Sequence, residues 1–301
     1  EFIDEAALSQ FGPGARVEYD PGLFDDRSRL MELLKQADGL IVRNRTQVDR
    51  DLLAAAPNLK VIGRLGVGLD NIDLEACAVR AIAVHPATGA NTLPVAEYVI
   101  TTALILLRNA YGAHDAMMAG DWPRTTLIGG EISGRVLALV GFGGIAQAVA
   151  TRARALGMQI IAYDPFLPAD DPAWQDACSC DLDQLLAQAD VLSVHVPLTP
   201  STHDMINTKA LALMKSTAIL INTSRGEVVD ASALAYALRH KQLAAAALDV
   251  FVTEPLTAAA AEPFAGLDNL LLTPHIAGLT IEANIRVSAI TVANVLKELR
   301  F

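Results

Sequence analysis

Three side chains with acid, base or anion-binding chemistry follow apolar runs in the second half of this sequence. Arg225, Glu254 and His275 each lie a few residues after such a run. A guanidinium can hold a carboxylate through two hydrogen bonds and polarise a neighbouring carbonyl group. A histidine can accept or donate a proton near neutral pH, and a carboxylate on its far ring nitrogen would fix its tautomer. These residue types suit the interconversion of a 2-hydroxy acid and a 2-oxo acid.

A glycine-rich stretch indicates the cofactor for such a reaction. Residues 135–164 combine two apolar runs, a glycine turn, a helical pattern and a final acid, which is typical of a dinucleotide-binding unit. In order these are the run 136–140, the glycines Gly141, Gly143 and Gly144, the helix 145–156, the run 159–163 and Asp164. The N–H groups at the helix start can face a pyrophosphate. The alternative is an ordinary glycine-rich turn between a strand and a helix.

Alternating apolar runs and helical patterns predict a parallel sheet around this unit. Strands are predicted at 136–140, 159–163, 190–194, 218–222, 244–248 and 269–272, and helices at 145–156, 182–189, 208–214 and 231–240. Such alternation is typical of parallel strands that are covered by helices on both faces. Ligands of these sheets bind at the carboxyl ends of the strands, where the Arg, Glu and His would lie.

Residues 1–93 predict a second, smaller α/β unit. Its strands are expected at 16–19, 39–45, 59–64 and 82–84, and its helices at 27–37, at 49–56 and from Asp73 onward. The fold class is therefore α/β, with two Rossmann-like doubly wound parallel-sheet domains. A last helical pattern over 281–299 is long enough to return to the first domain.

The longest apolar helix is predicted over 93–108. It is apolar on nearly all sides, so protein must cover it all round. We expect it to connect the two domains and to pack in a subunit interface, and the alternative is a core helix within one domain.

The composition argues against several classes of partner. The 301 residues carry a net charge of −11, which disfavours binding to nucleic acid or to an anionic membrane. There is no signal peptide and no run of 18 apolar residues. The odd cysteine count (Cys77, Cys178 and Cys180), without ligand spacing, predicts a cytoplasmic protein that lacks a metal. The sequence begins at Glu1, so it is open whether native N-terminal residues are missing.

Six motifs occur in a fixed order over nearly the whole chain. They are GRLGVGLDNIDLEA (63–76), VGFGGIAQ (140–147), HVPLTPSTHDMIN (195–207), NTSRGEVVD (222–230), ALDVFVTEP (247–255) and TPHIAG (273–278). At these residues the sequence resembles the D-isomer-specific 2-hydroxyacid dehydrogenase family, in its 3-phosphoglycerate dehydrogenase-like branch. The resemblance implies that Arg225, Glu254 and His275 match the family's catalytic Arg, Glu and His. It also implies an NAD-binding Rossmann domain over 94–278, inserted into a flavodoxin-like substrate-binding domain made of 1–93 and 279–301.

The resemblance extends to binding residues and assembly. Gly66, Val67 and Gly68 match the loop whose N–H groups hold the substrate carboxylate. The cofactor-lining positions fall on Gly144, Ile145, Asp164, Val196, Pro197, Thr223, Ser224, Asp249 and Gly278, and we also assign His195 and Thr202 to the cofactor site. Members are usually dimeric through the cofactor domain, so we expect a homodimer. Because the sequence ends at Phe301, we expect neither a C-terminal regulatory domain nor feedback control by an amino acid.

The residues after Asp164 bear on the choice of cofactor. Pro165, Phe166 and Leu167 follow it, so no Arg or Lys stands ready to receive a 2′-phosphate. A carboxylate against that phosphate would be repulsive. The sequence therefore predicts NAD rather than NADP.

Two arginines bear on the choice of substrate. Arg43 and Arg45 lie two residues apart at a strand end, so their side chains are expected to share a face. In phosphoglycerate dehydrogenases, arginines of the matching motif reach the substrate phosphate. A second anionic group on the substrate, such as a phosphate, sulfonate or carboxylate, is therefore expected, and the alternative is a pair of solvated edge arginines. Asn91, near the domain junction, is a further candidate for substrate contact.

The predicted function is hydride transfer between NAD(H) and a small 2-hydroxy or 2-oxo acid. The hydroxy acid is expected to have the D configuration and to be of phosphoglycerate, sulfolactate or glycerate type. An alternative is an NAD(H)-sensing interaction protein, like the corepressors of the same superfamily. A formate dehydrogenase would share the fold, but it would not need a step that moves a hydroxyl proton. The sequence leaves open which acid is used, in which direction, and the oligomeric state beyond a dimer.

Overall fold

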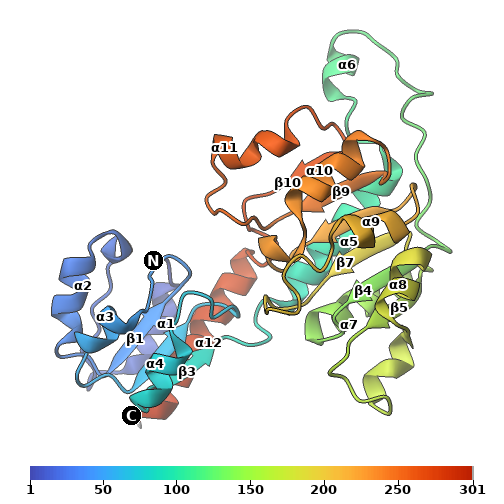
Figure 1. Cartoon of the computed structure of the whole chain (residues 1–301). Coiled ribbons are helices and arrows are strands. Elements are labelled where there is room, and N and C mark those ends of the chain that lie inside the picture. Colours follow the sequence, from blue (N-terminus) through green and yellow to red (C-terminus); the bar gives the residue numbers. More distant parts are fainter. Residues whose placement is uncertain (300–301) are drawn as a thin grey trace. The chain divides into compact units, whose positions relative to one another are not determined.

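The computed structural model describes residues 1–299, which form two compact units (Figure 1). The first unit comprises residues 1–91 and the described part of 279–301, and the second comprises residues 92–278. Arg300 and Phe301, which end the predicted segment 279–301, lie outside the described residues. Each unit contains a parallel sheet and helices, so the predicted α/β class is confirmed.

The sheet of the first unit has three parallel strands in the order β1-β2-β3. The strands are β1 (Gly39–Val42), β2 (Val61–Arg64) and β3 (Ala83–Pro86), and the α-helices are α1 (Glu5–Leu8), α2 (Arg27–Leu34), α3 (Arg50–Ala54), α4 (Leu74–Val79) and α12 (Ile281–Leu299). Asp49 caps the N-terminus of α3, because its side chain accepts the N–H of Leu52.

The two faces of β2 pack against different helices. Ile62 packs in a core with Leu52 of α3, whereas a Cβ at Gly63 would lie 2.7 Å from side-chain carbons of Thr291 and Val295 of α12. Glycine at position 63 therefore lets the C-terminal helix lie directly on a sheet that the N-terminal residues form.

The predicted strand over 16–19 is wrong, because the structure has no strand there. Arg16 pairs with Glu18, and Val17 is 42% exposed. Only Tyr19 of this segment packs against a core, so the alternating burial of a strand is absent.

The sheet of the second unit has seven parallel strands in the order β10-β9-β8-β7-β4-β5-β6. They are β4 (Val136–Val140), β5 (Gln159–Tyr163), β6 (Cys178–Ser179), β7 (Val191–Val194), β8 (Ile219–Asn222), β9 (Ala245–Leu248) and β10 (Leu270–Leu272). All six predicted strands are confirmed, with their ends within one residue. The edge strand β6 was not predicted, because its two residues are too few to show a periodic pattern.

Helices cover both faces of this sheet and form two cores. One core joins α5 (Thr92–Arg108) and α7 (Gly144–Ala155), and the other joins α8 (Leu182–Gln188), α9 (Thr208–Leu213) and α10 (Ala231–Arg239). Two short helices, α6 (His114–Met118) and α11 (Ala258–Ala261), lie in connecting segments. The strand order changes direction between β4 and β7, and in such sheets the ligand crevice lies at the carboxyl ends of the strands beside that point.

The apolar helix α5 buries one side, including Val99 and Ala103, in the core shared with α7. Ile100, Leu104 and Ile105 are only partly buried. The chain by itself thus leaves part of this helix uncovered. None of the helices within residues 1–299 is both long and apolar enough to cross a membrane.

Candidate active site

The glycine turn after β4 leaves room for a phosphate group. Gly141 has a φ of +85°, in the left-handed region that favours glycine, and a Cβ there would lie 2.7 Å from the carbonyl oxygen of His195. At Gly143 and Gly144 an added Cβ would meet nothing within 4 Å. This open space would let a pyrophosphate approach the N–H groups at the start of α7, where Ile145 lies.

Asp164 follows β5 and lies beside the glycine turn. Its Oδ2 accepts the N–H of Phe142 at 2.9 Å, and its Oδ1 accepts the N–H of Phe166 at 3.0 Å. A carboxylate oxygen can accept more than one hydrogen bond, so this pair of oxygens can also receive ribose hydroxyls. The same negative charge would repel a 2′-phosphate, which favours NAD over NADP.

His195, at the end of β7, supports the glycine turn from the neighbouring strand. Its Nε2 lies 2.9 Å from Ser193 Oγ, and its backbone N–H donates to the Val140 carbonyl at 2.7 Å. Although the residue keeps some solvent exposure, burial lowers the pKa of His195 to about 4. The imidazole is therefore neutral at pH 7, which suits a structural role better than proton transfer.

Thr202 closes the loop that follows His195. Its hydroxyl donates to the Pro197 carbonyl at 2.6 Å and accepts the Thr199 N–H at 2.8 Å. The hydroxyl is thus engaged within the loop. Thr202 therefore shapes the segment of Val196 and Pro197 rather than offering its hydroxyl to a ligand.

A buried amide shapes the turn that carries Arg225 after β8. The fully buried Asn222 accepts the N–H and the hydroxyl of Ser224 through Oδ1, at 3.0 and 2.8 Å, and donates from Nδ2 to the Arg225 carbonyl at 2.9 Å. Asn222 was not among the predicted site residues, although a polar residue that ends an apolar strand is a usable signal. Arg225 Nη1 donates to the Ser224 carbonyl at 2.6 Å.

Thr223, in the same turn, has a buried hydroxyl oxygen without a hydrogen-bond partner in the described part of the chain. Leaving a buried hydroxyl unpaired costs free energy. A polar group of a bound cofactor would remove that cost. Together with the open glycine turn and the Asp164 oxygens, Thr223 shows that the residues present fit NAD.

Gly226 brings the loops of Arg225 and Glu254 together. A Cβ at Gly226 would lie 2.1 Å from the carbonyl carbon of Phe251 and 2.3 Å from the N of Val252. Any other residue would push these backbones apart. Gly226 therefore helps to position the two loops, and it was not among the predicted site residues.

Glu254 and His275 form a hydrogen-bonded pair. Glu254 Oε2 lies 2.7 Å from His275 Nδ1, and its Oε1 accepts the Phe251 N–H at 3.0 Å. Burial acts to raise the pKa of Glu254, but the hydrogen bonds from His275 and Phe251, with the charges of His275 and Arg225, lower it overall. Because Glu254 takes Nδ1, Nε2 is the ring nitrogen of His275 that could exchange a proton with a substrate.

Asp249 holds the loop that carries His275. It is 1% exposed, and it accepts the Thr273 hydroxyl at 2.6 Å and the N–H groups of Ile276 and Ala277, each at 2.8 Å. Both carboxylate oxygens of Asp249 thus bind the segment 273–277, which precedes Gly278. Asp249 was predicted to line the cofactor, and in the structure its contacts are with this loop.

The predicted substrate residues Gly66, Val67, Gly68 and Asn91 all belong to the first unit. Gly66 has a φ of +144°, and a Cβ there would overlap the guanidinium of Arg64. Glycine at position 66 thus accommodates both the turn and the arginine. Asn91 has a buried Oδ1 with no hydrogen-bond partner among the described residues, so it could accept a hydrogen bond from a ligand.

The expectation that Arg43 and Arg45 share a face is wrong. Arg43 donates to Asn284 Oδ1 at 3.0 Å, whereas Arg45 pairs with Asp25 at 3.3 Å and lies over the Phe24 ring. Strand β1 ends before both arginines, so the alternation of a strand no longer governs them. Burial lowers the pKa of Arg43, and the nearby Glu1 opposes that effect.

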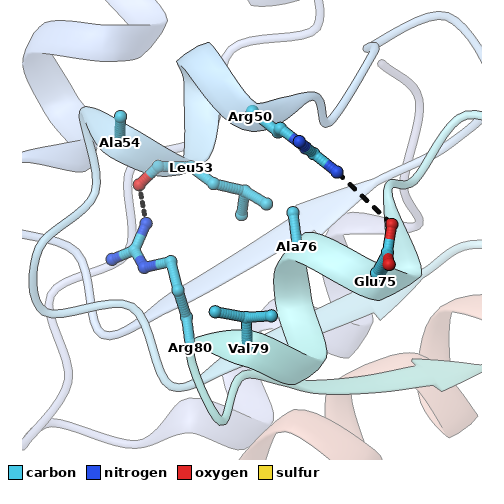
Figure 2. Close-up of a pocket in the computed structure, with 7 residues that line it drawn as sticks. All are labelled: Arg50, Leu53, Ala54, Glu75, Ala76, Val79 and Arg80. Atoms are coloured by element: carbon cyan, nitrogen blue, oxygen red, sulfur yellow. Dashed lines mark hydrogen bonds and ion pairs between the residues drawn. The ribbon is translucent and has the colours of Figure 1, made fainter.

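A hollow of about 380 Å³ lies between α3 and α4 of the first unit (Figure 2). Its apolar floor includes Leu53 and Val79, and Arg50 and Glu75 pair across its rim. At the other end of the hollow, the Arg80 guanidinium donates to the Leu53 carbonyl. The charged groups of the rim are thus paired, and no nucleophile or proton-transfer pair lines the hollow, so it is not the site of the chemistry.

Within residues 1–299, no group of three His, Cys, Asp or Glu side chains is placed to hold a metal ion. The second unit instead combines a dinucleotide turn at the switch point of a parallel sheet with an Arg, a Glu and a His after neighbouring strands. These features define the class of nicotinamide-dependent oxidoreductases.

Comparison with known proteins identifies the family. Residues 100–277 match the model for the D-isomer specific 2-hydroxyacid dehydrogenase, NAD binding domain. The chain is 52% identical over 300 residues to (S)-sulfolactate dehydrogenase of Chromohalobacter salexigens, covering 99% of this chain and 96% of that protein. It is 39% identical to D-3-phosphoglycerate dehydrogenase of Methanocaldococcus jannaschii, covering 99% of this chain but 56% of that longer protein.

The structure is also similar to D-lactate dehydrogenase of Aquifex aeolicus complexed with NAD and lactic acid, with a TM-score of 0.82 and 31% identity over 90% of this chain and 85% of that one. The chain belongs to the D-isomer-specific 2-hydroxyacid dehydrogenase family. It is an NAD-dependent oxidoreductase that transfers a hydride between NAD(H) and a small 2-hydroxy or 2-oxo acid. The corepressor-like alternative is not favoured, because these relatives are named as dehydrogenases.

Proposed function

We propose that the chain acts on a D-configured 2-hydroxy acid that carries a second anionic group, with a sulfonate as the leading candidate. The proposal draws on the 52% identity to an (S)-sulfolactate dehydrogenase. In the (R)/(S) nomenclature, the carbon that bears the sulfonate of sulfolactate has a higher priority than the carboxyl carbon. The (S) form of sulfolactate therefore has the same spatial arrangement as D-lactate. The substrate of that relative is therefore consistent with a D-specific site.

Arg225, Glu254 and His275 are the proposed catalytic residues. Bound NAD(H) supplies or takes up the hydride. Arg225 would hold the substrate carboxylate and polarise the 2-oxo group through charge-assisted hydrogen bonds. His275 would donate a proton from Nε2 during reduction and take it back during oxidation, while Glu254 on Nδ1 stabilises the charged ring. The observation that carries this proposal is the 2.7 Å contact between Glu254 and His275, on loops that follow neighbouring strands.

The second anionic group would be bound by residues of the first unit. Val67 and Gly68 would donate their backbone N–H groups to the carboxylate, and Asn91 Oδ1 would accept the substrate hydroxyl. Gly66 would shape this loop, because its own N–H donates to the Arg64 carbonyl at 2.8 Å. Arg43 is the preferred partner for the sulfonate, because Arg45 already has Asp25 as its ion-pair partner. These assignments, and the roles of 1–93 with 279–301 as substrate domain and 94–278 as cofactor domain, are proposals.

A substrate screen with NADH tests the proposed function. Pyruvate, glyoxylate and hydroxypyruvate would be compared with 3-sulfopyruvate and phosphohydroxypyruvate, by following the loss of NADH absorbance. We expect kcat/KM for 3-sulfopyruvate to exceed that for pyruvate by about tenfold or more, the effect of one added charge-assisted hydrogen bond. Equal values on monoanionic and dianionic acids would remove the second anionic group from the proposal. Absence of turnover with every acid, despite NADH binding, would overturn the proposed activity.

A homodimer is also proposed. Residues 109–130, here called the arm, carry exposed apolar side chains at Tyr111, Met118, Trp122 and Ile128, each at least 75% exposed. The arm extends from the second unit with α6 in it (Figure 1), and its end is tied back where Gly130 N–H donates to the Leu107 carbonyl at 2.7 Å. Together with the uncovered side of α5, this apolar surface suits an interface.

Light scattering on the purified protein tests the dimer. The wild type is expected at twice the chain mass, and the double variant Met118→Asp/Trp122→Asp at the chain mass. Val79→Asp, at an exposed apolar residue of the first unit, is the matched control and should stay dimeric. A monomeric wild type would contradict the proposal. We also propose a cytoplasmic location, which the free cysteines Cys77, Cys178 and Cys180 support.

A further inference from the structure

Helix α5 contributes a tyrosine to the loop of the proposed proton donor. Tyr98 Oη lies 2.6 Å from Thr273 Oγ1, and Thr273 in turn donates to Asp249 Oδ1 at 2.6 Å. The two partners are 175 residues apart in the sequence. We propose that Tyr98 is a positioning residue for His275, acting through Thr273 and Asp249; this role rests on the proposed function of His275.

The direction of the hydrogen bonds follows from counting donors. The Asp249 carboxylate receives the Ile276 and Ala277 N–H groups, one on each oxygen, so it acts as an acceptor. The single hydroxyl proton of Thr273 goes to Asp249, so Thr273 can only accept from Tyr98. The chain therefore runs from the Tyr98 O–H to the Thr273 O–H and then to the carboxylate. Without the tyrosine proton, the Thr273 hydroxyl loses one of the two bonds that orient it.

The loop needs such support because of the backbone of His275. Its φ is +56°, in the left-handed region that a residue with a Cβ adopts at a cost. The His275 N–H donates to the Thr273 carbonyl at 3.0 Å, and the next two N–H groups donate to Asp249. The contacts that hold His275 in this conformation thus lie on both sides of it and meet at Thr273 and Asp249.

The environment of Tyr98 suits a hydroxyl that donates and stays protonated. Burial, and then the nearby Asp249 charge, raise the pKa of Tyr98, while hydrogen bonds to Thr273 and Thr102 act in the opposite direction. Tyr98 is therefore not a proton shuttle, and its contribution is to the geometry of the loop. A loop that is less well held would place the His275 ring less often within reach of a substrate.

A double-mutant cycle with Tyr98→Phe and Thr273→Val tests the inference. In the otherwise wild-type enzyme, Tyr98→Phe is expected to lower kcat about tenfold, the effect of one hydrogen bond, and to leave the Kd for NADH within about twofold. The isotope effect with deuterated NADH should rise, because the chemical step becomes slower. In the Thr273→Val background, Tyr98→Phe should change kcat less than about twofold. Tyr236→Phe, which removes an exposed hydroxyl from α10, is the control.

Hydrogen exchange of the segment 273–278 gives a second measurement that does not depend on turnover. Tyr98→Phe should speed exchange at Ile276 and Ala277 relative to Tyr236→Phe. The role of Tyr98 would be overturned if Tyr98→Phe lowered kcat by the same factor in the wild-type and Thr273→Val backgrounds. It would also be overturned if Tyr98→Phe left hydrogen exchange in the segment 273–278 unchanged. If the wild type turns over no acid, the proposed function fails, and the exchange measurement alone decides whether Tyr98 holds the loop.

Discussion

The carboxyl edges of the two sheets carry charged residues that the chain uses in different ways. At the edge of the seven-stranded sheet, Asn222, Asp249 and Glu254 bind the backbone of neighbouring loops. At the edge of the three-stranded sheet, Arg43 and Arg45 donate to Asn284 and Asp25 on other segments. The first edge uses acids and amides to build loops that present Arg225 and His275. The second binds its two arginines individually to parts of the chain.

Functional and structural charged residues thus differ in the contacts that surround them. A proposed catalytic residue is held by neighbouring side chains that are themselves fixed by hydrogen bonds. Glu254 binds the ring of His275, and Asp249 binds the backbone of the loop that carries it. A charged residue that is paired with a carboxylate on the surface, as Arg45 is with Asp25, contributes little, because solvent screens the pair. If this distinction holds, substitutions at the edge of the seven-stranded sheet should affect activity more than substitutions of the two arginines.

The largest effect is expected from His275→Ala. Loss of the general acid and base should lower kcat about a thousandfold, while the Kd for NADH changes less than about twofold. Stopped-flow or steady-state loss of NADH measures the rate, and fluorescence titration measures binding. His240→Ala, at the exposed residue that follows α10, is the control. A loss below about tenfold would show that His275 does not transfer the proton.

A smaller effect is expected at Asp164. The double variant Asp164→Ala/Phe166→Arg should shift the ratio of kcat/KM for NADH over NADPH by about a hundredfold, because it removes a repulsion and adds a partner for the 2′-phosphate. Kinetics with both cofactors at saturating acid measure the ratio. An unchanged ratio would remove the assignment of Asp164 to the ribose.

The arginine pair should give about a tenfold effect. Arg43→Ala is expected to lower kcat/KM for 3-sulfopyruvate about tenfold relative to pyruvate, and Arg43→Lys should recover part of the loss. Arg45→Ala, whose side chain is 60% exposed, should change the ratio less than about twofold. If neither variant changes the ratio, the two arginines contribute only to the structure of the first unit and do not bind the substrate.

The smallest effect concerns stability and pH. The lowered pKa of Glu254 contributes stability above its usual value of 4.5, and this stability is lost as the pH falls through the lowered pKa. Glu254→Gln should therefore destabilise by less than about 1 kcal/mol at pH 7, after allowance for its partial exposure, and by less still at acid pH. Urea unfolding at several pH values measures this. A constant difference at all pH values would contradict it.

Much of the second unit could be predicted from the sequence, because its signals are local. Apolar runs set the six long strands of its sheet, and the spacing from Gly141 to Asp164 marks the dinucleotide turn. The motifs around Arg225, Glu254 and His275 identified the family. In the first unit the same reasoning failed at 16–19, where a short pattern had no partner strand. It also failed for the directions of Arg43 and Arg45, which lie beyond a strand end.

The order of the elements, the α/β class and the family could all be inferred from the sequence, which also supplied Arg225, Glu254 and His275 as the proposed catalytic residues. The groups that hold these residues in place became clear only in three dimensions. The contact of Gly226 with Phe251, the bonds of Asp249 to the 273–277 loop and the bond of Tyr98 to Thr273 join residues that are distant along the chain. Periodicity and turn chemistry act over a few residues, so they contain no information on these pairs. Close packing in three dimensions determines them.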